Sequence, residues 1–208
     1  MLYLASQSPR RAQLLDQLGV AYQVVTAPID ESVAADEKPG GYVERMAREK
    51  ALAGWDHVAK PPAMVLGADT SVVVDEEILG KPANRRHALS LLAQLSGRTH
   101  QVMTGVALYD GALMRNVVSV TDVTFRAISR EMAEAYWDTG EPADKAGGYA
   151  IQGRGAIFVT KIVGSYSGVV GLPLFEVAEL FAATGVEVMR AGERFEVATY
   201  PPTSGNSR

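Results

Sequence analysis

Apolar residues recur along the chain in two patterns, short continuous runs and stripes at three- and four-residue spacing, which predict strands and helices respectively. Runs and stripes alternate over the first half of the chain, so we expect β-α units there. The predicted strands cover residues 2–5, 22–26, 64–74, 100–109, 112–125 and 156–162, with short strands near 186–189 and 195–198. The predicted helices cover residues 9–18, 41–58, 85–96, 129–139 and 174–183.

Turn and capping residues support these boundaries. Ser8 before Pro9 is a favourable helix start, and Asn84 is a typical N-cap for the third helix. Asp110-Gly111 separates the two longest neighbouring strands and is a strong signal for an antiparallel hairpin. The combination of β-α units with a long hairpin predicts an α/β fold in which helices flank a mixed sheet.

The composition is that of an ordinary globular protein: 208 residues, of which 47% are hydrophobic and 21% charged. A net charge of −4 without a basic stripe argues against nucleic acid as a partner. The absence of cysteine excludes disulfides, zinc-thiolate sites and thiol nucleophiles. Since neither a signal-peptide pattern nor the ~20 apolar residues of a membrane span occurs, we expect a cytoplasmic protein without a membrane partner. The end of the chain, residues 201–208, is expected to be a frayed tail.

The first turn between a strand and a helix is a candidate anion site. Free N–H groups at a helix start favour a negative charge, and Ser6 and Ser8 add hydroxyl donors. Arg10 and Arg11 follow, and their guanidinium groups match phosphate oxygens in geometry. The competing interpretation is a pair of solvated arginines beside a plain serine cap.

Two charged residues interrupt apolar patterns. Lys50 stands seven residues after Val43 and four after Met46, on the predicted buried stripe of its helix. Asp69 lies inside the apolar run of residues 64–74, where an unpaired carboxylate would cost several kcal/mol. Lys50 either reaches the solvent along the stripe or points into a site, and Asp69 belongs either to a structural ion pair or to a functional centre.

Three further segments carry polar groups of less specific meaning. Glu31 lies in an acidic loop, Lys81 in a Gly-Lys-Pro loop, and Gln152 in the glycine-rich segment 146–155, where backbone can approach a ligand closely. Together with the arginines, the lysines offer positive charge to a polyphosphate. The carboxylates of Glu31 and Asp69 offer hard oxygen ligands for Mg²⁺ or Mn²⁺.

The histidines do not suggest a catalytic arrangement. His57, His87 and His100 are scattered without metal spacing, and we expect each at the surface or in a hairpin. No nucleophile–histidine–acid pattern stands out, so covalent catalysis is disfavoured.

The order and spacing of these motifs resemble the Maf family of nucleotide pyrophosphatases over nearly the whole chain, from Leu2 to about Leu180. The motifs that carry the resemblance are Leu4-Ala5-Ser6-Gln7-Ser8-Pro9-Arg10-Arg11, Arg48-Glu49-Lys50-Ala51, Gly67-Ala68-Asp69-Thr70, Gly80-Lys81-Pro82, and Ser165-Tyr166 through Gly171-Leu172-Pro173-Leu174.

The resemblance implies an elongated α/β fold of the Maf and ITPase kind, with two lobes around a deep cleft, formed here by a single domain of residues 1–200. It implies a homodimer that hydrolyses the bond between the α- and β-phosphates of a nucleoside triphosphate with a divalent metal. The implied roles are Asp69 as proton acceptor, Lys50 and Lys81 as catalytic cations, Ser6, Ser8 and Arg11 as substrate ligands, and Glu31 and Asp69 as metal ligands.

Within the family, Arg10, Thr70 and Gln152 resemble the branch that acts on dTTP and UTP. The branch that acts on 7-methyl-GTP tends to carry glutamine in place of Thr70 and glutamate in place of Gln152. A neutral amide can pair with the acceptor and donor of a thymine or uracil edge, whereas a carboxylate suits guanine donors. The remaining alternatives are 7-methyl-GTP pyrophosphatase, a nucleotide-binding regulator of septum formation without turnover, and a structural α/β module.

Overall fold

A computed structural model describes residues 1–58, 62–186 and 188. One seven-stranded mixed sheet organises the chain, with the strand order β2-β1-β3-β5-β6-β7 and with β4 also paired to β3. The strands are β1 (Leu2–Ala5), β2 (Tyr22–Val24), β3 (Met64–Val74), β4 (Glu77–Leu79), β5 (Thr99–Tyr109), β6 (Met114–Phe125) and β7 (Val159–Val163). The helices are α1 (Pro9–Asp16), α2 (Pro39–Trp55), α3 (Arg85–Leu95), α4 (Arg130–Asp138), α5 (Tyr166–Val170) and α6 (Leu174–Ala182), with 3₁₀ turns at Glu141–Asp144, Ala146–Gly148 and Arg154–Phe158.

The sheet changes direction at β3. On one side β1 pairs with β3 in parallel, from Leu2 opposite Met64 to Ala5 opposite Gly67. On the other side β5 pairs with β3 antiparallel along most of its length, and β6 continues the antiparallel order. The predicted mixed sheet flanked by helices is therefore confirmed.

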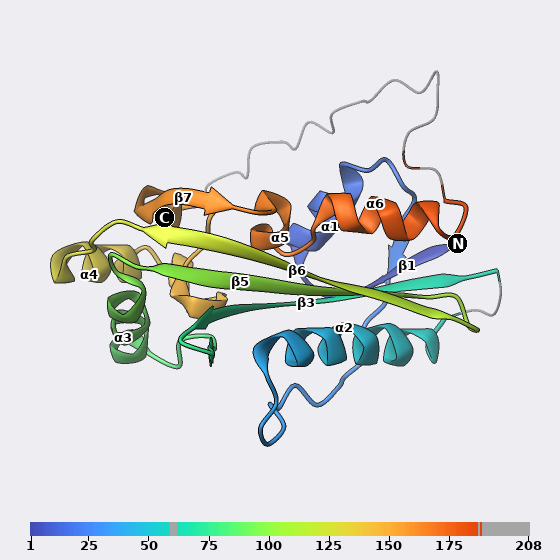
Figure 1. The fold of residues 1–208 in the computed structure, drawn as a ribbon, viewed down its shortest axis with the longest axis horizontal. Coiled ribbons are helices and arrows are strands. Elements are labelled where there is room, and N and C mark those ends of the chain that lie inside the picture. Colours follow the sequence, from blue (N-terminus) through green and yellow to red (C-terminus); the bar gives the residue numbers. More distant parts are fainter. Residues whose placement is uncertain (59–61, 187, 189–208) are drawn as a thin grey trace, which may run out of the picture.

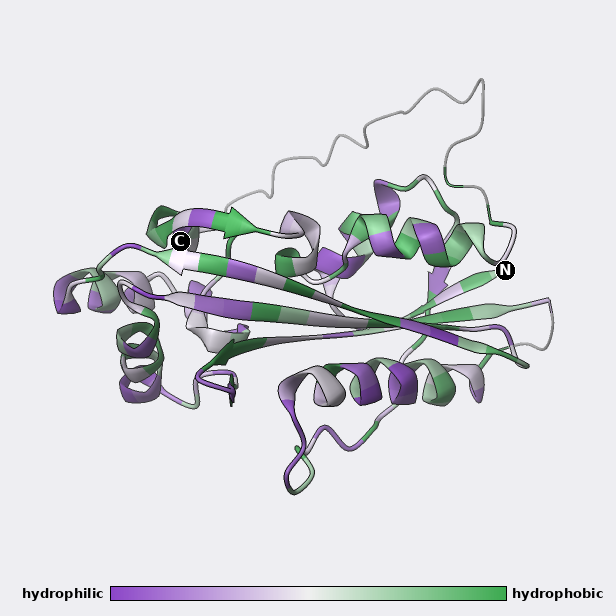
Figure 2. Cartoon of the chain, in the orientation of Figure 1, coloured by the Kyte–Doolittle hydropathy of each residue, from purple (hydrophilic) through white to green (hydrophobic). Residues whose placement is uncertain are grey.

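Helices cover both faces of an elongated sheet (Figure 1). The helix α2 lies under one face, α1, α5 and α6 lie over the other, and α3 and α4 lie at one end of the long strands. Figure 2 shows hydrophobic and hydrophilic residues alternating along those strands. Among the described residues, no helix combines the length and apolarity that crossing a membrane requires.

Small residues let α2 approach the sheet closely. Its contact cluster consists of Ala5, Ala47, Ala51, Val65 and Ala107. A methyl group added at Gly67 would lie 2.2 Å from the carbonyl oxygen of Ala47, and one added at Gly105 would lie 2.2 Å from that of Val43. Because no side chain fits there, these two glycines set the distance between α2 and the strands against which it packs.

The predicted elements match the structure best where the apolar pattern is long. Strands 2–5 and 64–74 have the predicted bounds, and Asn84 caps α3 by accepting a 2.9 Å bond from the backbone N–H of His87. The pattern missed β4 and the five-residue α5, and it placed residues 156–158 in a strand although they form a 3₁₀ turn. Residues 187 and 189 of the strand expected near 186–189 fall outside the described residues, and the strand near 195–198 and the tail 201–208 fall wholly outside them.

His100 lies in the hairpin of β5 and β6, one of its two expected positions, and not at the surface. His100 is 2% exposed, because the first residues of β5 carry it into the main core. Its Nε2 lies 2.9 Å from the hydroxyl of Tyr149, and its ring packs edge-on against Phe125 and Tyr149. Burial lowers the pKa of His100 to about 4.

This burial predicts a pH-dependent stability. Unfolded chains bind a proton at His100 near pH 6.5, whereas the folded chain resists it until about pH 4. The free energy of unfolding should therefore fall by about 3 kcal/mol as the pH drops from 6.5 to 4. Urea titrations of wild type and His100→Gln across this range measure the effect, and the variant should show a flatter profile. His57→Gln, at an exposed position, should keep the wild-type profile; an equally steep profile in His100→Gln would contradict the assignment.

Candidate active site

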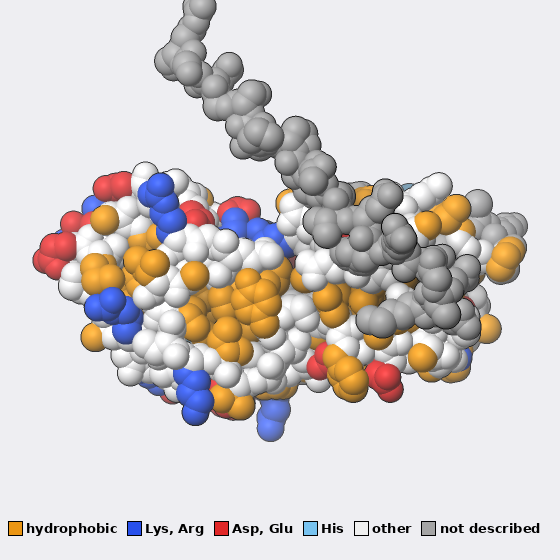
Figure 3. Space-filling view, turned by 90° about the horizontal axis from the view of Figure 1, so that it is seen from above, with side chains coloured by type: hydrophobic (Ala, Val, Ile, Leu, Met, Phe, Trp, Pro, Cys, Tyr) orange, Lys and Arg blue, Asp and Glu red, His pale blue; other side chains and the backbone are white. Residues whose placement is uncertain are grey.

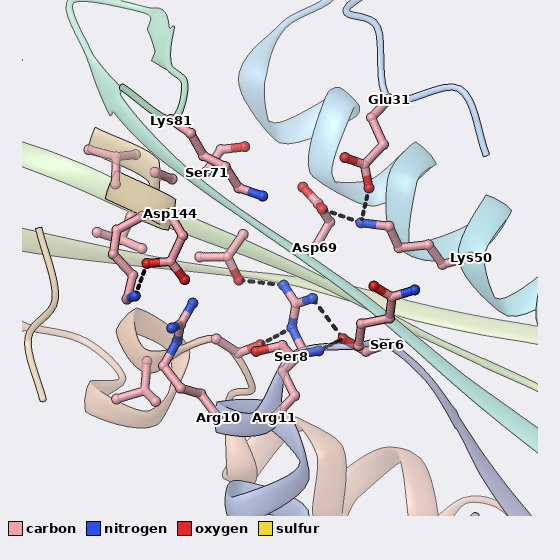
Figure 4. Close-up of a pocket in the computed structure, with 18 of the residues that line it drawn as sticks. Ser6, Ser8, Arg10, Arg11, Glu31, Lys50, Asp69, Ser71, Lys81 and Asp144 are labelled. Atoms are coloured by element: carbon pink, nitrogen blue, oxygen red, sulfur yellow. Dashed lines mark hydrogen bonds and ion pairs between the residues drawn. The ribbon is translucent and has the colours of Figure 1, made fainter. Parts of the chain in front are cut away.

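One cavity of about 850 Å³ collects every residue that the sequence singled out for the site. Its wall is built from the β1–α1 turn, the loop before α2, α2 itself, the middle of β3, the loop after β4, the 144–152 segment and the end of α5. Figure 4 shows side chains from these separate segments pointing toward one another. The predicted residues that line it are Ser6, Ser8, Arg10, Arg11, Glu31, Lys50, Asp69, Thr70, Lys81 and Gln152.

Lys50 lies between the two predicted metal ligands. Its Nζ is 2.7 Å from Oδ1 of Asp69 and 2.8 Å from Oε1 of Glu31 (Figure 4). The side chains of Lys50 and Asp69 are only 15% and 14% exposed, whereas that of Glu31 is 57% exposed. Of the two alternatives for Lys50, the structure shows the one that points into the site, and Asp69 has the ion pair that its burial requires.

The loop that carries Glu31 is fastened to α2. Arg45 donates two 2.7 Å bonds to the carboxylate of Glu37 and one 2.9 Å bond to the carbonyl of Ser32. Tyr42 donates a 2.9 Å bond to the backbone carbonyl of Glu31. Sequence reasoning missed these residues, because a charged residue on the outside of a helix normally signals only solvent.

Charged groups in and around this loop shift the pKa values of its side chains and of Tyr42. The bond from Arg45 lowers the pKa of Glu37 to about 2. Burial, with the nearby carboxylates of Asp69 and Glu31, raises the pKa of Tyr42 to about 12. The hydrogen bond from Lys50 lowers the pKa of Glu31, with smaller contributions from more distant cations such as Lys81. Near neutral pH the loop therefore keeps ionised carboxylates and a protonated tyrosine.

Arg11 is held in one orientation. Its Nε donates to the carbonyl of Gly171 at 2.8 Å, one terminal nitrogen donates to Ser6 Oγ at 3.2 Å, and the other donates to Thr70 Oγ1 at 3.1 Å. Burial lowers the pKa of Arg11, opposed by the charge of Asp69. A guanidinium has five N–H donors, so these bonds leave one on each terminal nitrogen. Two donors side by side suit two oxygens of one phosphate.

The start of α1 contributes differently from a standard cap. Ser8 occupies the N-cap position, but its side chain makes no capping bond within α1. Its backbone N–H donates a 3.2 Å bond to Ser6 Oγ, the same oxygen that Arg11 reaches. The hydroxyl of Ser8, which lines the cavity, is therefore not used by the helix.

A third group of charges lies across the cavity from Lys50. Arg10 faces Asp144 in Figure 4, and Asp144 is paired with its neighbour Lys145. The bond from Lys145, with further help from Arg10, lowers the pKa of Asp144. Sequence reasoning missed Asp144, which stands in a polar stretch that looks like ordinary surface.

The glycine-rich segment is ordered by a single carboxylate. Glu141 accepts bonds from the hydroxyl of Tyr136 at 2.6 Å and from the backbone N–H groups of Arg154 and Gly155 at 2.8 and 3.0 Å. The same hydroxyl accepts a 3.1 Å bond from the N–H of Ala150. These bonds bracket Gln152 on both sides and hold it at the cavity wall.

The donor set fits a divalent metal only in part. Among the described residues no cluster of three or more His, Cys, Asp or Glu side chains is placed to hold a metal ion. Glu31 and Asp69 supply two hard carboxylates around one cation position, that of the Lys50 ammonium. Mg²⁺ commonly binds through one or two carboxylates and completes its shell with water and substrate phosphates. The site therefore fits a metal that arrives together with a polyphosphate.

Replacing Lys50 by methionine tests the pairing of the carboxylates. Lys50→Met should raise the pKa of Glu31 toward its ordinary value, because the largest contribution to its lowering is the bond from Lys50. The stability contributed by a carboxylate with a lowered pKa is present above its unfolded pKa and lost as the pH falls, so the variant should lose less stability in acid. NMR titration of the Glu31 carboxyl carbon measures the pKa. Lys81→Met should raise it less, and an unchanged titration in Lys50→Met would contradict the pairing.

Comparison with known proteins identifies the family to which this chain is similar. A family model described as "Maf-like protein" matches residues 1–184. Proteins named dTTP/UTP pyrophosphatase from Alkalilimnicola ehrlichii and Saccharophagus degradans are each 52% identical to the chain; they cover 91% and 90% of it, and 95% and 90% of their own lengths. One of the same name from Vibrio cholerae is 51% identical over 86% of the chain and 95% of its own length.

Among solved structures, the Staphylococcus aureus Ham1 protein aligns with a TM-score of 0.44 and 14% identity, over 60% of this chain and 71% of that one. The sequence relatives are half identical over most of the chain, and the family model spans both the strands and the cavity. The chain therefore belongs to the Maf family.

Proposed function

We propose that this protein is a nucleoside triphosphate pyrophosphatase that hydrolyses dTTP and UTP to the monophosphate and pyrophosphate. One observation carries the proposal: five cationic side chains and three carboxylates from distant segments line a single cavity. The names of the relatives from Alkalilimnicola and Vibrio support the choice of substrates. We further propose that residues 1–200 form one domain with two lobes and that the protein works in the cytoplasm, where its substrates are found.

In the proposed mechanism the cationic side chains bind the triphosphate, and the carboxylate of Asp69 activates the attacking water. The two unused donors of Arg11 bind one phosphate, and Lys81 neutralises another. Asp69 accepts a proton from a water molecule, whose oxygen attacks the α-phosphorus in line with the departing group. The bond from that phosphorus to the bridging oxygen breaks, and pyrophosphate leaves.

We propose that Glu31 and Asp69 hold Mg²⁺ or Mn²⁺ when the substrate is bound. The ion would neutralise phosphate charge and orient the triphosphate. Since Lys50 is bonded to both carboxylates, binding of a divalent ion between them requires its ammonium to move, and a phosphate oxygen is its natural new partner. Lys50 would thus pair with the carboxylates before the metal and substrate bind, and with the phosphates afterwards.

Base selection is assigned to Arg10, Thr70 and Gln152, which line the same cavity. The amide of Gln152 can both donate to and accept from a uracil or thymine edge. The neighbouring pair of Asp144 and Lys145 adds polar groups at that end, facing Arg10.

We also propose that the protein is a homodimer. Exposed apolar side chains occur on two helices that lie over the sheet: Tyr166 on α5 and Phe175 on α6 are 50% and 74% exposed. Figure 3, which views this face from above, shows apolar side chains gathered near its middle. Such a patch favours contact with another protein surface.

Removal of the proposed base should abolish turnover. Asp69→Asn is expected to lower the rate of pyrophosphate release by about 10²–10⁴-fold, the usual contribution of general base catalysis. Circular dichroism and thermal unfolding report whether the fold is intact. Asp75→Asn, in the exposed turn at the end of the same strand, should retain full activity. Undiminished turnover in a folded Asp69→Asn variant would remove Asp69 from this role.

A substrate panel separates the proposal from its alternatives. With Mg²⁺ or Mn²⁺, kcat/KM for dTTP and UTP should exceed that for 7-methyl-GTP. Gln152→Glu should lower kcat/KM for UTP about tenfold, since it removes one hydrogen-bond donor to the base. A preference for 7-methyl-GTP would favour the other branch. Nucleotide binding without pyrophosphate release by the wild type would favour the regulator of septum formation.

A further inference from the structure

A fully buried hydroxyl group lies behind the cavity wall, one layer away from Arg11. Thr104 on β5 stands directly opposite Thr70 on β3 in the sheet register and is 0% exposed. Its Oγ1 lies 2.9 Å from Oγ1 of Thr70 and 2.8 Å from the backbone carbonyl oxygen of Gly168. Arg11 contacts Thr70, Thr70 contacts Thr104, and Thr104 contacts Gly168. These three contacts form a continuous chain of hydrogen bonds.

The direction of every bond in this chain is fixed from its two ends. A carbonyl oxygen can only accept, so the hydroxyl of Thr104 donates its one proton to Gly168. A guanidinium can only donate, so Thr70 accepts from Arg11. The contact between the two threonines then has one solution, in which Thr70 donates to Thr104. The lone pairs of Thr70 are consequently aimed at Arg11.

We propose that Thr104 is a positioning residue for Arg11 and acts on it through Thr70. Thr104 holds the Thr70 hydroxyl in the one rotation that accepts from Arg11, while Gly171 and Ser6 hold the other two nitrogens. Gly168 and Gly171 belong to α5 and its C-cap, so the chain ties α1, β3, β5 and α5 to the orientation of one guanidinium. The inference rests on the proposed function only in that Arg11 binds a phosphate.

This chain also gives Thr70 a physical role. The resemblance to the family assigns Thr70 to substrate choice, yet its hydroxyl is bonded to Arg11 and Thr104. Thr70 therefore influences the substrate by setting where the two free donors of Arg11 point. A glutamine at this position, with a longer side chain, would move the guanidinium.

The test replaces the hydroxyl without changing the shape of the side chain. Thr104→Val keeps the volume and removes the donor and acceptor, whereas Thr104→Ser keeps both. Thr99→Val is the matched control, because Thr99 pairs with Thr124 at 2.9 Å across β5 and β6, in an exposed part of the same sheet. The first readout needs no ligand: the hydrogen exchange rate of the Arg11 Nε–H group, measured by NMR.

We expect Thr104→Val to speed exchange at Arg11 and to weaken binding of inorganic triphosphate about three- to tenfold, the equivalent of one hydrogen bond. Thr104→Ser and Thr99→Val should behave like wild type. In an Arg11→Met background, Thr104→Val should weaken binding no further. Normal exchange at Arg11 in Thr104→Val, or failure of Thr104→Ser to restore it, would overturn the proposal.

The experiment separates this inference from the proposed function. Altered exchange at Arg11 in a protein that releases no pyrophosphate from any nucleotide would leave the positioning role in place and refute the enzymatic proposal. Normal turnover of dTTP together with unaltered exchange in Thr104→Val would refute the positioning role and leave the enzymatic proposal in place.

Discussion

The ammonium of Lys50 is the charge on which the site depends. Two carboxylates in a partly buried position repel each other and lose hydration, and a cation 2.7 and 2.8 Å from them offsets both costs. The position of that cation is set by the packing of α2, which lies close to β3 and β5 because Gly67 and Gly105 leave no side chain in between. The same helix fastens the Glu31 loop through Arg45 and Tyr42. The packing of α2 against the sheet therefore also sets the positions of the charges in the site.

The net charge of the protein says little about its ligand. The chain carries −4 overall, yet the cavity brings together Arg10, Arg11, Lys50 and Lys81. Binding of an anion needs only a local excess of donors, and the carboxylates beside them match a metal that accompanies a phosphate chain. The combination explains how an acidic protein can bind a strongly acidic ligand.

Much of the sheet and most of the site were predictable from the sequence, and the reasons are specific. The strand of residues 64–74 is a long apolar run, so its bounds were clear, and Asp69 was conspicuous because a carboxylate is costly there. That distant segments meet in one cavity came from the family resemblance and not from periodicity.

The supporting residues could not be found in this way. Thr104, Glu141 and Arg45 look like ordinary strand, loop and helix residues, and their roles exist only through partners far away in the chain. The same limit applies to His100, whose burial depends on how Phe125 and Tyr149 pack around it.

The pairing of β3 has a consequence for how the cavity can vary. The strand loses β1 as a neighbour after Gly67 and gains β4 only at Val72, so residues 68–71 are flanked by β5 on one side alone. The cavity lies beside this stretch of β3, on the side where no strand pairs with it. Because its floor is held from the β5 side, the loops around the opening can change length or sequence without unpairing the sheet. New substrate preferences can therefore arise at the rim while Asp69 stays in register.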